Sequence, residues 1–306
     1  MMDLRTVLVP GSLELKNPVL SAAGTMGYGL EYEAYGDITA LGGIVTNGIT
    51  LAPCAGAPMP RIVETPSGLL SAVGLQNCGA RHFVDEILPR IPWNHVPVIP
   101  NVNATNVDDF AAIAEILAEE RGVAAIEVNL DCANDHRGGQ PFCQNPVTAA
   151  RAVNSVCRHA GGKPVIAKLS PLAMDIVEVA RAVEAAGANI ISCIGPLRGM
   201  SVDVRSRRSR LGSPSGRLSG PAIKPVALLC VREIARVVRI PIIGMGGVSS
   251  ARDVLEFMLV GASAVEVGSC CLGDPAAIFR IVRDLPGECA MQGIDSLSSL
   301  RGAIRT

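Results

Sequence analysis

One pattern recurs along most of this chain: a short apolar run rich in Val and Ile, then a loop, then a segment with helical periodicity. The units follow one another at intervals of roughly thirty residues, the usual size of a β-α unit. Strand-like runs that are apolar throughout indicate burial on both faces, which is typical of parallel strands covered by helices. The pattern therefore predicts an α/β protein. Its clearest segments are VPVIPNV (96–102), DDFAAIAEILAEERG (108–122), AAIEVNL (124–130), PVIAKLSP (164–171), DIVEVARAVEAAGA (175–188), NIISCIG (189–195), PIIGMGG (241–247), ARDVLEFMLVGA (251–262) and SAVEVGS (263–269).

A closed (β/α)8 TIM barrel is favoured over a doubly wound open sheet. The first 75 residues contain no G-x-G-x-x-G turn between a strand and a helix, which an open dinucleotide-binding sheet would carry. Barrels of this type commonly reach 306 residues as one domain, so we expect a single domain over residues 1–306. The segment LRTVLVPGSLELKNPVLSAAG at 4–24 begins with the alternation of a β-hairpin. This N-terminal hairpin is expected to plug the bottom of the barrel.

The charge balance points to a small-molecule partner. Charged residues make up only 18% of the chain and the formal net charge is -1, so no overall field would attract nucleic acid or a membrane surface. The segment Met1 to Pro10 contains Asp3 and Arg5 and lacks a long apolar run, so it predicts neither a secretory signal nor a membrane anchor. We expect a cytoplasmic protein.

The ten cysteines do not form a metal-binding pattern. No two of them are spaced as C-x-x-C, so the ligand spacing of a zinc knuckle or a ferredoxin-type cluster is missing. Several lie within apolar runs, where a buried free thiol in a reducing compartment is the ordinary interpretation. No metal site is predicted.

Glycines follow two consecutive strands near the C-terminus. Gly246 and Gly247 follow one strand, and Gly268 and Ser269 follow the next. Backbone N–H groups at such strand ends, close to a helix N-terminus, form an anion site, and in barrels phosphate is commonly bound after strands seven and eight. We therefore predict a phosphate site; the alternative is that these glycines only make tight turns.

Polar residues at other strand ends favour a flavin over a sugar phosphate. Asn101 and Asn129 can pair with the donor and acceptor edge of an isoalloxazine ring, and Lys168 can stabilise the charge of the reduced form. This combination suits FMN. The alternative for Lys168 is a buried structural ion pair.

Cys132 is the candidate catalytic residue. It lies three residues after Asn129, in a long polar loop within 128–146 that is typical of a mobile lid. A thiol there can take or give a proton while a flavin moves a hydride. The alternatives are a merely packed cysteine and His136 as the acid or base.

The chain resembles the dihydroorotate dehydrogenases, particularly the class that works with an FAD and iron–sulfur subunit. The resemblance covers nearly the whole chain. Its most specific pieces are LKNPVLSAAG, PRIVETPSGLLSAVGLQN, IEVNLDCAN, AKLSP, LSGPAIKPVAL and IIGMGGV.

The resemblance implies roles for individual residues. Cys132 takes the place of the base that removes a proton from dihydroorotate as FMN accepts a hydride. The positions implied to contact FMN are Ala23, Gly24, Asn47, Asn101, Asn129, Lys168, Ile194, Gly220, Gly246, Gly247, Gly268 and Ser269. Those implied to contact substrate are Asn47, Ser71, Val73, Gly74, Leu75, Asn129, Gly195 and Pro196. The resemblance also implies a homodimer that binds a subunit carrying FAD and a [2Fe–2S] cluster, with fumarate or another soluble electron acceptor as the alternative.

The chain departs from the family pattern on the substrate side. Asn47 replaces a lysine that reaches both flavin and the orotate carboxylate, and Ser71 replaces an asparagine that binds substrate. Gly195-Pro196 replaces an Asn-Thr pair, and the motif around Cys132 gains Asp131. Each lost hydrogen bond to a charged group would cost about 1.5–3 kcal/mol. These departures favour a changed substrate, another small cyclic amide or unsaturated acid.

Three alternatives stay open beside that hypothesis. The chain can be a genuine dihydroorotate dehydrogenase catalytic subunit, a flavin-binding subunit without substrate chemistry of its own, or a non-flavin barrel such as a phosphosugar isomerase. Cys132 argues against the second.

Two basic elements have no assigned partner. Arg198 can restore a cation near the substrate or be a solvated loop side chain. The run from Arg205 to Arg210 is interpreted as a solvated loop, with contact to an anionic substrate, to the flavin phosphate or to an acidic redox partner as the alternatives.

Overall fold

The centre of the computed structural model, which describes residues 2–134 and 139–305, is a parallel eight-stranded sheet. The order of the strands around the sheet is β3-β18-β17-β12-β11-β8-β7-β4. In chain order they are β3 (Val19–Ser21), β4 (Ile44–Ile49), β7 (Val98–Val102), β8 (Ile126–Asn129), β11 (Val165–Leu169), β12 (Ile190–Cys193), β17 (Ile242–Met245) and β18 (Ala264–Val267).

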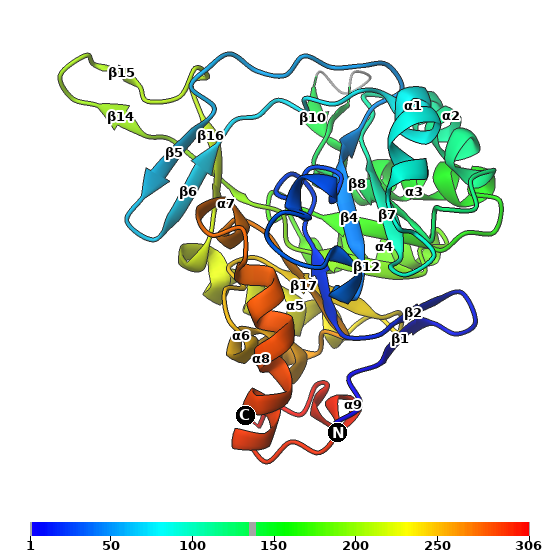
Figure 1. The fold of residues 1–306 in the computed structure, drawn as a ribbon. Coiled ribbons are helices and arrows are strands. Elements are labelled where there is room, and N and C mark those ends of the chain that lie inside the picture. The colour runs from blue at the N-terminus through cyan, green and yellow to red at the C-terminus, as the bar shows by residue number, and fades with distance from the viewer. Residues whose placement is uncertain (1, 135–138, 306) are drawn as a thin grey trace.

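The sheet curls back on itself, and its two end strands meet. A parallel bridge joins Leu20 of β3 to Gly43, just before β4, and the Gly42 N–H donates to the Val19 carbonyl at 2.8 Å. Together with the sequential strand order this closes the barrel, which confirms the predicted (β/α)8 architecture (Figure 1).

Helices cover the outside of the barrel (Figure 1). The longer ones are α2 (Val107–Ala118), α3 (Pro146–His159), α4 (Ile176–Ala185), α5 (Lys224–Ala235), α6 (Ala251–Val260) and α8 (Ala277–Met291), and the short ones are α1 (Ala80–His82), α7 (Cys270–Gly273) and α9 (Leu297–Leu300). Side-chain caps begin several of them: the Asp175 carboxylate accepts from two N–H groups of α4, and Ser250 and Asp253 form a capping box on α6. No helix within the described residues is both long and apolar enough to cross a membrane.

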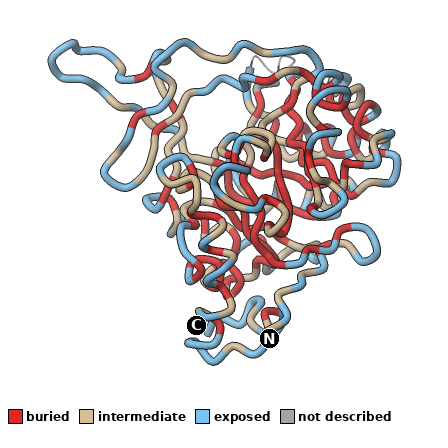
Figure 2. The backbone as a smooth tube through the Cα atoms, in the orientation of Figure 1, coloured by how far each residue is buried: buried red, intermediate tan, exposed pale blue. Residues whose placement is uncertain are grey.

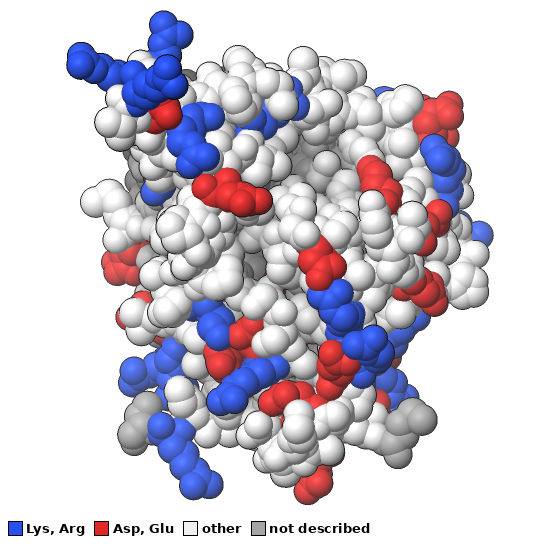
Figure 3. Space-filling model, turned by 60° about the vertical axis from the view of Figure 1, so that its left-hand side comes forward, with Lys and Arg blue, Asp and Glu red and all other residues white. Residues whose placement is uncertain are grey.

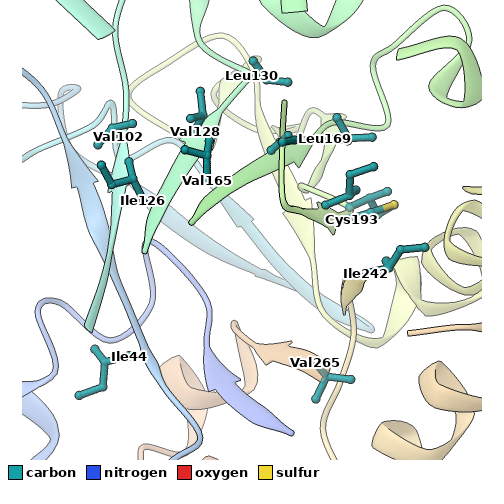
Figure 4. Packing of buried hydrophobic residues seen from close by; sticks show 14 of the residues in the cluster. Ile44, Val102, Ile126, Val128, Leu130, Val165, Leu169, Cys193, Ile242 and Val265 are labelled. Atoms are coloured by element: carbon teal, nitrogen blue, oxygen red, sulfur yellow. The ribbon is translucent and has the colours of Figure 1, made fainter. Parts of the chain in front are cut away.

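The alternation of side chains along each strand divides the barrel interior from the helix layer. Outward residues such as Ile126, Val165 and Val265 belong to the large apolar cluster beneath the helices (Figure 4). Inward residues at the bottom, such as Ile99 and Ile166, form a second, smaller apolar cluster. Because side chains alternate with period two, the next inward position on each strand lies one layer closer to the top of the barrel.

The N-terminal hairpin plugs the bottom, as predicted. Strands β1 (Thr6–Val9) and β2 (Leu13–Leu15) pair antiparallel, and Leu8, Leu13 and Leu15 are buried in the same cluster as the inward bottom residues. Water is thereby kept out of this end, so the open end of the barrel is the one at which the strands terminate.

A second sheet lies beyond the carboxyl ends of the barrel strands. It has the order β13-β16-β6-β5 and is formed by β5 (Ile62–Thr65), β6 (Gly68–Ser71), β13 (Leu197–Gly199) and β16 (Gly216–Ser219). A two-stranded arm of β14 (Val202–Asp203) and β15 (Arg208–Ser209) extends from it, and two short strands, β9 (Ala133–Asn134) and β10 (Gln140–Pro141), pair beside β8. Figure 2 shows that this upper region is largely exposed or intermediate, in contrast to the buried barrel.

Candidate active site

The residues predicted to bind FMN are gathered at one end of the barrel. Parallel strands all terminate at the same rim, so the residues that follow β3, β4, β7, β8, β11, β12, β17 and β18 meet there. The predicted residues at this rim are Ala23, Gly24, Asn47, Asn101, Asn129, Lys168, Ile194, Gly246, Gly247, Gly268 and Ser269.

Lys168 sits in a buried layer of polar side chains just below the rim. Its Nζ lies 3.2 Å from Glu127 Oε2 and 3.2 Å from Glu266 Oε2. The other oxygen of Glu127 accepts a 2.7 Å hydrogen bond from the Ser192 hydroxyl. Lys168 thus has the ion pair that was its alternative interpretation, and this pair holds the ammonium group at the strand end.

The three ionisable groups of this layer share one negative and one positive charge. Burial alone would raise the pKa of Glu127, but the Lys168 ammonium and several hydrogen bonds lower it below the ordinary value. Burial and the neighbouring Glu127 carboxylate raise the pKa of Glu266 well above the ordinary value. Burial lowers the pKa of Lys168, but both carboxyl groups outweigh it and the net shift is upward. Glu127 is therefore ionised, Glu266 holds its proton, and Lys168 is charged.

A chain of carboxamides links this layer to Cys132. The Asn101 amide donates to Glu127 Oε2, and the Asn103 amide donates to Asn101 Oδ1 at 2.8 Å. The oxygen of Asn103 then accepts from the Asn129 amide at 2.8 Å and from the Cys132 thiol at 3.2 Å. The orientation of each amide is set by the next, so the thiol is positioned through a continuous polar network.

The Cys132 thiol is held in its neutral form. It lies 2.7 Å from the Asn129 carbonyl oxygen, its residue is 6% exposed, and burial together with the nearby Asp131 carboxylate raises the pKa of the thiol to about 12. A thiol with such a pKa is almost entirely protonated at neutral pH. The small fraction present as thiolate is a strong base.

The glycines after β17 leave space that a side chain would fill. Gly246 and Gly247 have φ values of 115° and 82°, which L-residues rarely adopt. A Cβ on Gly247 would lie 2.8 Å from the Gly220 carbonyl oxygen and 2.8 Å from the Lys224 Cβ. The backbone turn at Gly220 and the turn at Gly247 therefore meet closely, and only a residue without a side chain fits between them.

A buried acceptor at the rim lacks a partner. Asn47 Oδ1 is buried and makes no hydrogen bond within the part of the chain that the structure describes. Buried polar atoms are almost always satisfied, so this oxygen is available to accept from a donor on a bound group. The unpaired oxygen and the glycine turns fit a flavin with a phosphate tail.

Similarity to known proteins identifies the family of this chain. The family model described as dihydroorotate dehydrogenase matches residues 6–288. The chain belongs to the dihydroorotate dehydrogenase family. It is therefore an oxidoreductase of a flavin-dependent family that acts on a CH–CH bond, which confirms the resemblance seen in the sequence.

Several curated members of the dihydroorotate dehydrogenase family are similar over almost the full chain. One from Solidesulfovibrio magneticus is 52% identical over 300 residues, which cover 98% of both chains. Others from Maridesulfovibrio salexigens and Trichlorobacter lovleyi are 46% and 47% identical, and each alignment covers 96% of both chains. All three are named dihydroorotate dehydrogenase B (NAD(+)), catalytic subunit.

The residues predicted to contact substrate in this member of the dihydroorotate dehydrogenase family do not all lie at the barrel rim. Ser71 lies at the end of β6, opposite Arg217 of β16, and Gly195 and Pro196 directly follow the barrel rim. Val73, Gly74 and Leu75 are exposed, and no hydrogen bond between described residues joins them to Cys132. His136 lies outside the described residues.

Sequence reasoning missed four side chains of the network, Asn103, Glu127, Ser192 and Glu266. The two glutamates stand in the middle of apolar strand runs, AAIEVNL and SAVEVGS, and a charge in such a run is the signal that would have marked them. Arg217 was missed as well, because nothing in its local sequence indicates which loop its strand faces. Within residues 2–134 and 139–305, no cluster of His, Cys, Asp or Glu is arranged to hold a metal ion.

Proposed function

We propose that this chain is a catalytic subunit that oxidises dihydroorotate to orotate at a bound FMN, in one domain spanning residues 1–306. The observation that carries the proposal is the Cys132 thiol, held 3.2 Å from Asn103 Oδ1 at the barrel rim in a chain of this family. Full-length similarity to proteins named dihydroorotate dehydrogenase B catalytic subunit supports the choice of substrate.

FMN is the cofactor that the rim suits best. Gly220, Gly246, Gly247, Gly268 and Ser269 would hold its phosphate through backbone N–H groups. The polar side chains that would hold its ring are Asn47, Asn101, Asn129 and Lys168, next to the backbone of Ala23, Gly24 and Ile194. When bound, FMN supplies the acceptor for the hydride that leaves the substrate.

Cys132 would act as the base. Its thiolate takes a proton from C5 of dihydroorotate, and the electrons of that C–H bond form the C5–C6 double bond as the hydride leaves C6. Asn103 and the Asn129 carbonyl position the sulfur for this transfer. Lys168 keeps a positive charge in the layer beneath the rim, where it favours anionic charge developing above it.

The changed-substrate hypothesis finds no support among the relatives, which favour dihydroorotate instead. The substitutions at Asn47, Ser71 and Gly195 are real features of this chain. We propose that the substrate contacts these three positions together with Asn129, Pro196 and the segment from Val73 to Leu75. We propose that Arg217, whose guanidinium pairs with Asp131 in the Cys132 loop, supplies the positive charge that Asn47 does not carry.

The electrons would leave through another protein. The relatives are named as catalytic subunits of an NAD(+)-dependent enzyme, and this chain carries neither a dinucleotide fingerprint nor cluster ligands with C-x-x-C spacing. We propose a cytoplasmic homodimer that associates with an FAD and iron–sulfur electron-transfer subunit.

The direct test is reduction of the bound flavin. Purified protein loaded with FMN is mixed with dihydroorotate without oxygen, and the flavin absorbance is followed, with an artificial acceptor present in a second series. The proposal expects rapid bleaching and stoichiometric orotate. Cys132→Ala should bind the flavin and orotate but bleach at least about 100-fold more slowly, the range of a lost acid–base group. A wild-type flavin that dihydroorotate leaves oxidised, while another cyclic acid reduces it, would overturn the proposal.

A further inference from the structure

Arg217 and Asp131 form an ion pair directly beside the catalytic thiol. Arg217 Nη2 lies 3.1 Å from Asp131 Oδ2, and Asp131 precedes Cys132 in the chain. The side chain of Arg217 is 31% exposed and that of Asp131 14% exposed. Arg217 comes from the upper sheet and Asp131 from the end of β8, so the pair connects that sheet to the barrel rim.

Strand pairing gathers further polar side chains on the same face of the upper sheet. Arg217 is opposite Ser71 of β6 on one side and opposite Arg198 of β13 on the other. Residues directly opposite in antiparallel strands share one face and lie close together. The charge of Arg198 also acts on Asp131. Burial raises the pKa of the Asp131 carboxyl, and the positive charges of Arg217 and Arg198 oppose that rise.

The pair is incompletely satisfied. Arg217 Nη1 and Asp131 Oδ1 are both buried and make no hydrogen bond to any residue that the structure describes. Lys168 differs, because its ammonium is already shared between two glutamates. The guanidinium of Arg217 therefore retains a free N–H donor, and the carboxylate of Asp131, the residue before Cys132, retains a free acceptor oxygen.

We infer that Arg217 and Asp131 recognise the substrate, with Arg217 Nη1 donating to its carboxylate and Asp131 Oδ1 accepting from the adjacent ring N–H. This inference rests on the proposed function and deepens it. Dihydroorotate carries its carboxylate on the ring carbon that is bonded to a ring N–H. The ligand therefore presents an acceptor and a donor side by side, and these match the donor of Arg217 and the acceptor of Asp131. The ligand class is a cyclic amide with a carboxylate beside the N–H. Ser71 and Arg198 border the same place.

The experiment compares ligands that differ only in the carboxylate. Binding of orotate and of uracil to the FMN-loaded protein is measured by isothermal titration calorimetry, a readout independent of turnover. For Arg217→Gln, the Kd of orotate should rise about 10- to 100-fold, as expected for a lost hydrogen bond between charged groups. The Kd of uracil should change less than about threefold. Arg208→Gln, which removes an exposed arginine from β15, is the matched control and should leave both values unchanged.

A second variant covers the case in which Arg217→Gln fails to fold because Asp131 is left unpaired. The double variant Arg217→Gln/Asp131→Asn replaces the ion pair by two neutral amides and should show the same loss of preference for orotate over uracil. Equal Kd ratios in the wild type and the double variant would overturn the inference even if dihydroorotate is oxidised. If the wild type prefers orotate but dihydroorotate leaves the flavin oxidised, the proposed function fails and the recognition site stands. A wild type that binds uracil as tightly as orotate overturns the recognition site.

Discussion

The Lys168 ammonium lies 3.2 Å from the Glu127 carboxylate in the barrel interior, one layer below the rim where the flavin site is proposed. Glu266 Oε2 lies 3.2 Å from the same ammonium, and the Glu266 carboxyl keeps its proton. Lys168 thus has one ionised partner and one neutral partner that can ionise if the first is removed.

The buried carboxyl groups should substitute for each other. Glu266→Gln mimics the protonated acid, so it should cost less than about 1 kcal/mol of unfolding free energy. Glu127→Gln should cost about 1–3 kcal/mol through its hydrogen bonds, while Glu266 ionises to pair with Lys168. The double variant leaves Lys168 buried without an anion. Its loss of unfolding free energy should therefore exceed the sum of the losses in the two single variants. Urea unfolding of the three variants measures this, and strictly additive losses would contradict the shared role.

The rate of flavin reduction should rise with pH. The pKa of the Cys132 thiol is about 12, so its thiolate fraction grows roughly tenfold per pH unit below that value. Stopped-flow measurement with dihydroorotate should show kcat/KM increasing from about pH 7 to about pH 10 without a plateau. Cys157→Ser removes a thiol of α3 and should leave the profile unchanged. A profile that is flat above neutral pH would show that Cys132 is not the base.

Gly247→Ala should weaken flavin binding. The new Cβ would lie 2.8 Å from the Gly220 carbonyl oxygen, so the two turns of the proposed phosphate site must separate. The Kd of FMN, measured by flavin fluorescence on the apoprotein, should rise at least about tenfold, the equivalent of about 1.4 kcal/mol.

Gly162→Ala provides the control for this experiment. Gly162 has nearly the same φ, 83° against 82°, but no atom lies within 4 Å of its added Cβ, and it lies in the turn before β11 at the other end of the barrel. The backbone strain of the two variants is alike, about 1–2 kcal/mol. Equal FMN affinities in both variants would place the phosphate elsewhere.

The basic arm should be dispensable for the half-reaction with substrate. Arg205, Arg207 and Arg208 are exposed, and strands β14 and β15 pair only with each other. On the face that Figure 3 presents, acidic and basic side chains are interspersed, apart from a basic group projecting at the upper left. Replacing the three arginines with glutamine should change flavin reduction by dihydroorotate less than about twofold, because solvated charges contribute little. A tenfold increase in the KM of dihydroorotate would instead assign the arm to the substrate.

Local patterns in the sequence were enough to predict the architecture and the proposed flavin-binding half of the site. Apolar strand runs alternating with helical segments predicted the barrel, and alternation in the first residues predicted its plug. The sequence alone predicts one shared location for Gly246, Gly247, Asn101, Asn129 and Lys168, because parallel strands in a barrel all end at one rim.

The partners of those residues depended on the tertiary structure. The period of a strand shows that Glu127, Lys168 and Glu266 point inward, but only the closure and register of the barrel bring both carboxyl groups to 3.2 Å from one ammonium. Arg217 and Asp131 belong to different sheets, and their contact is set by the pairing of β16 with β6 and by its packing over the β8 loop. By itself, therefore, the sequence determined which side chains reach the rim. Which of them meet was decided by register and packing, because contacts between distant segments leave no local pattern.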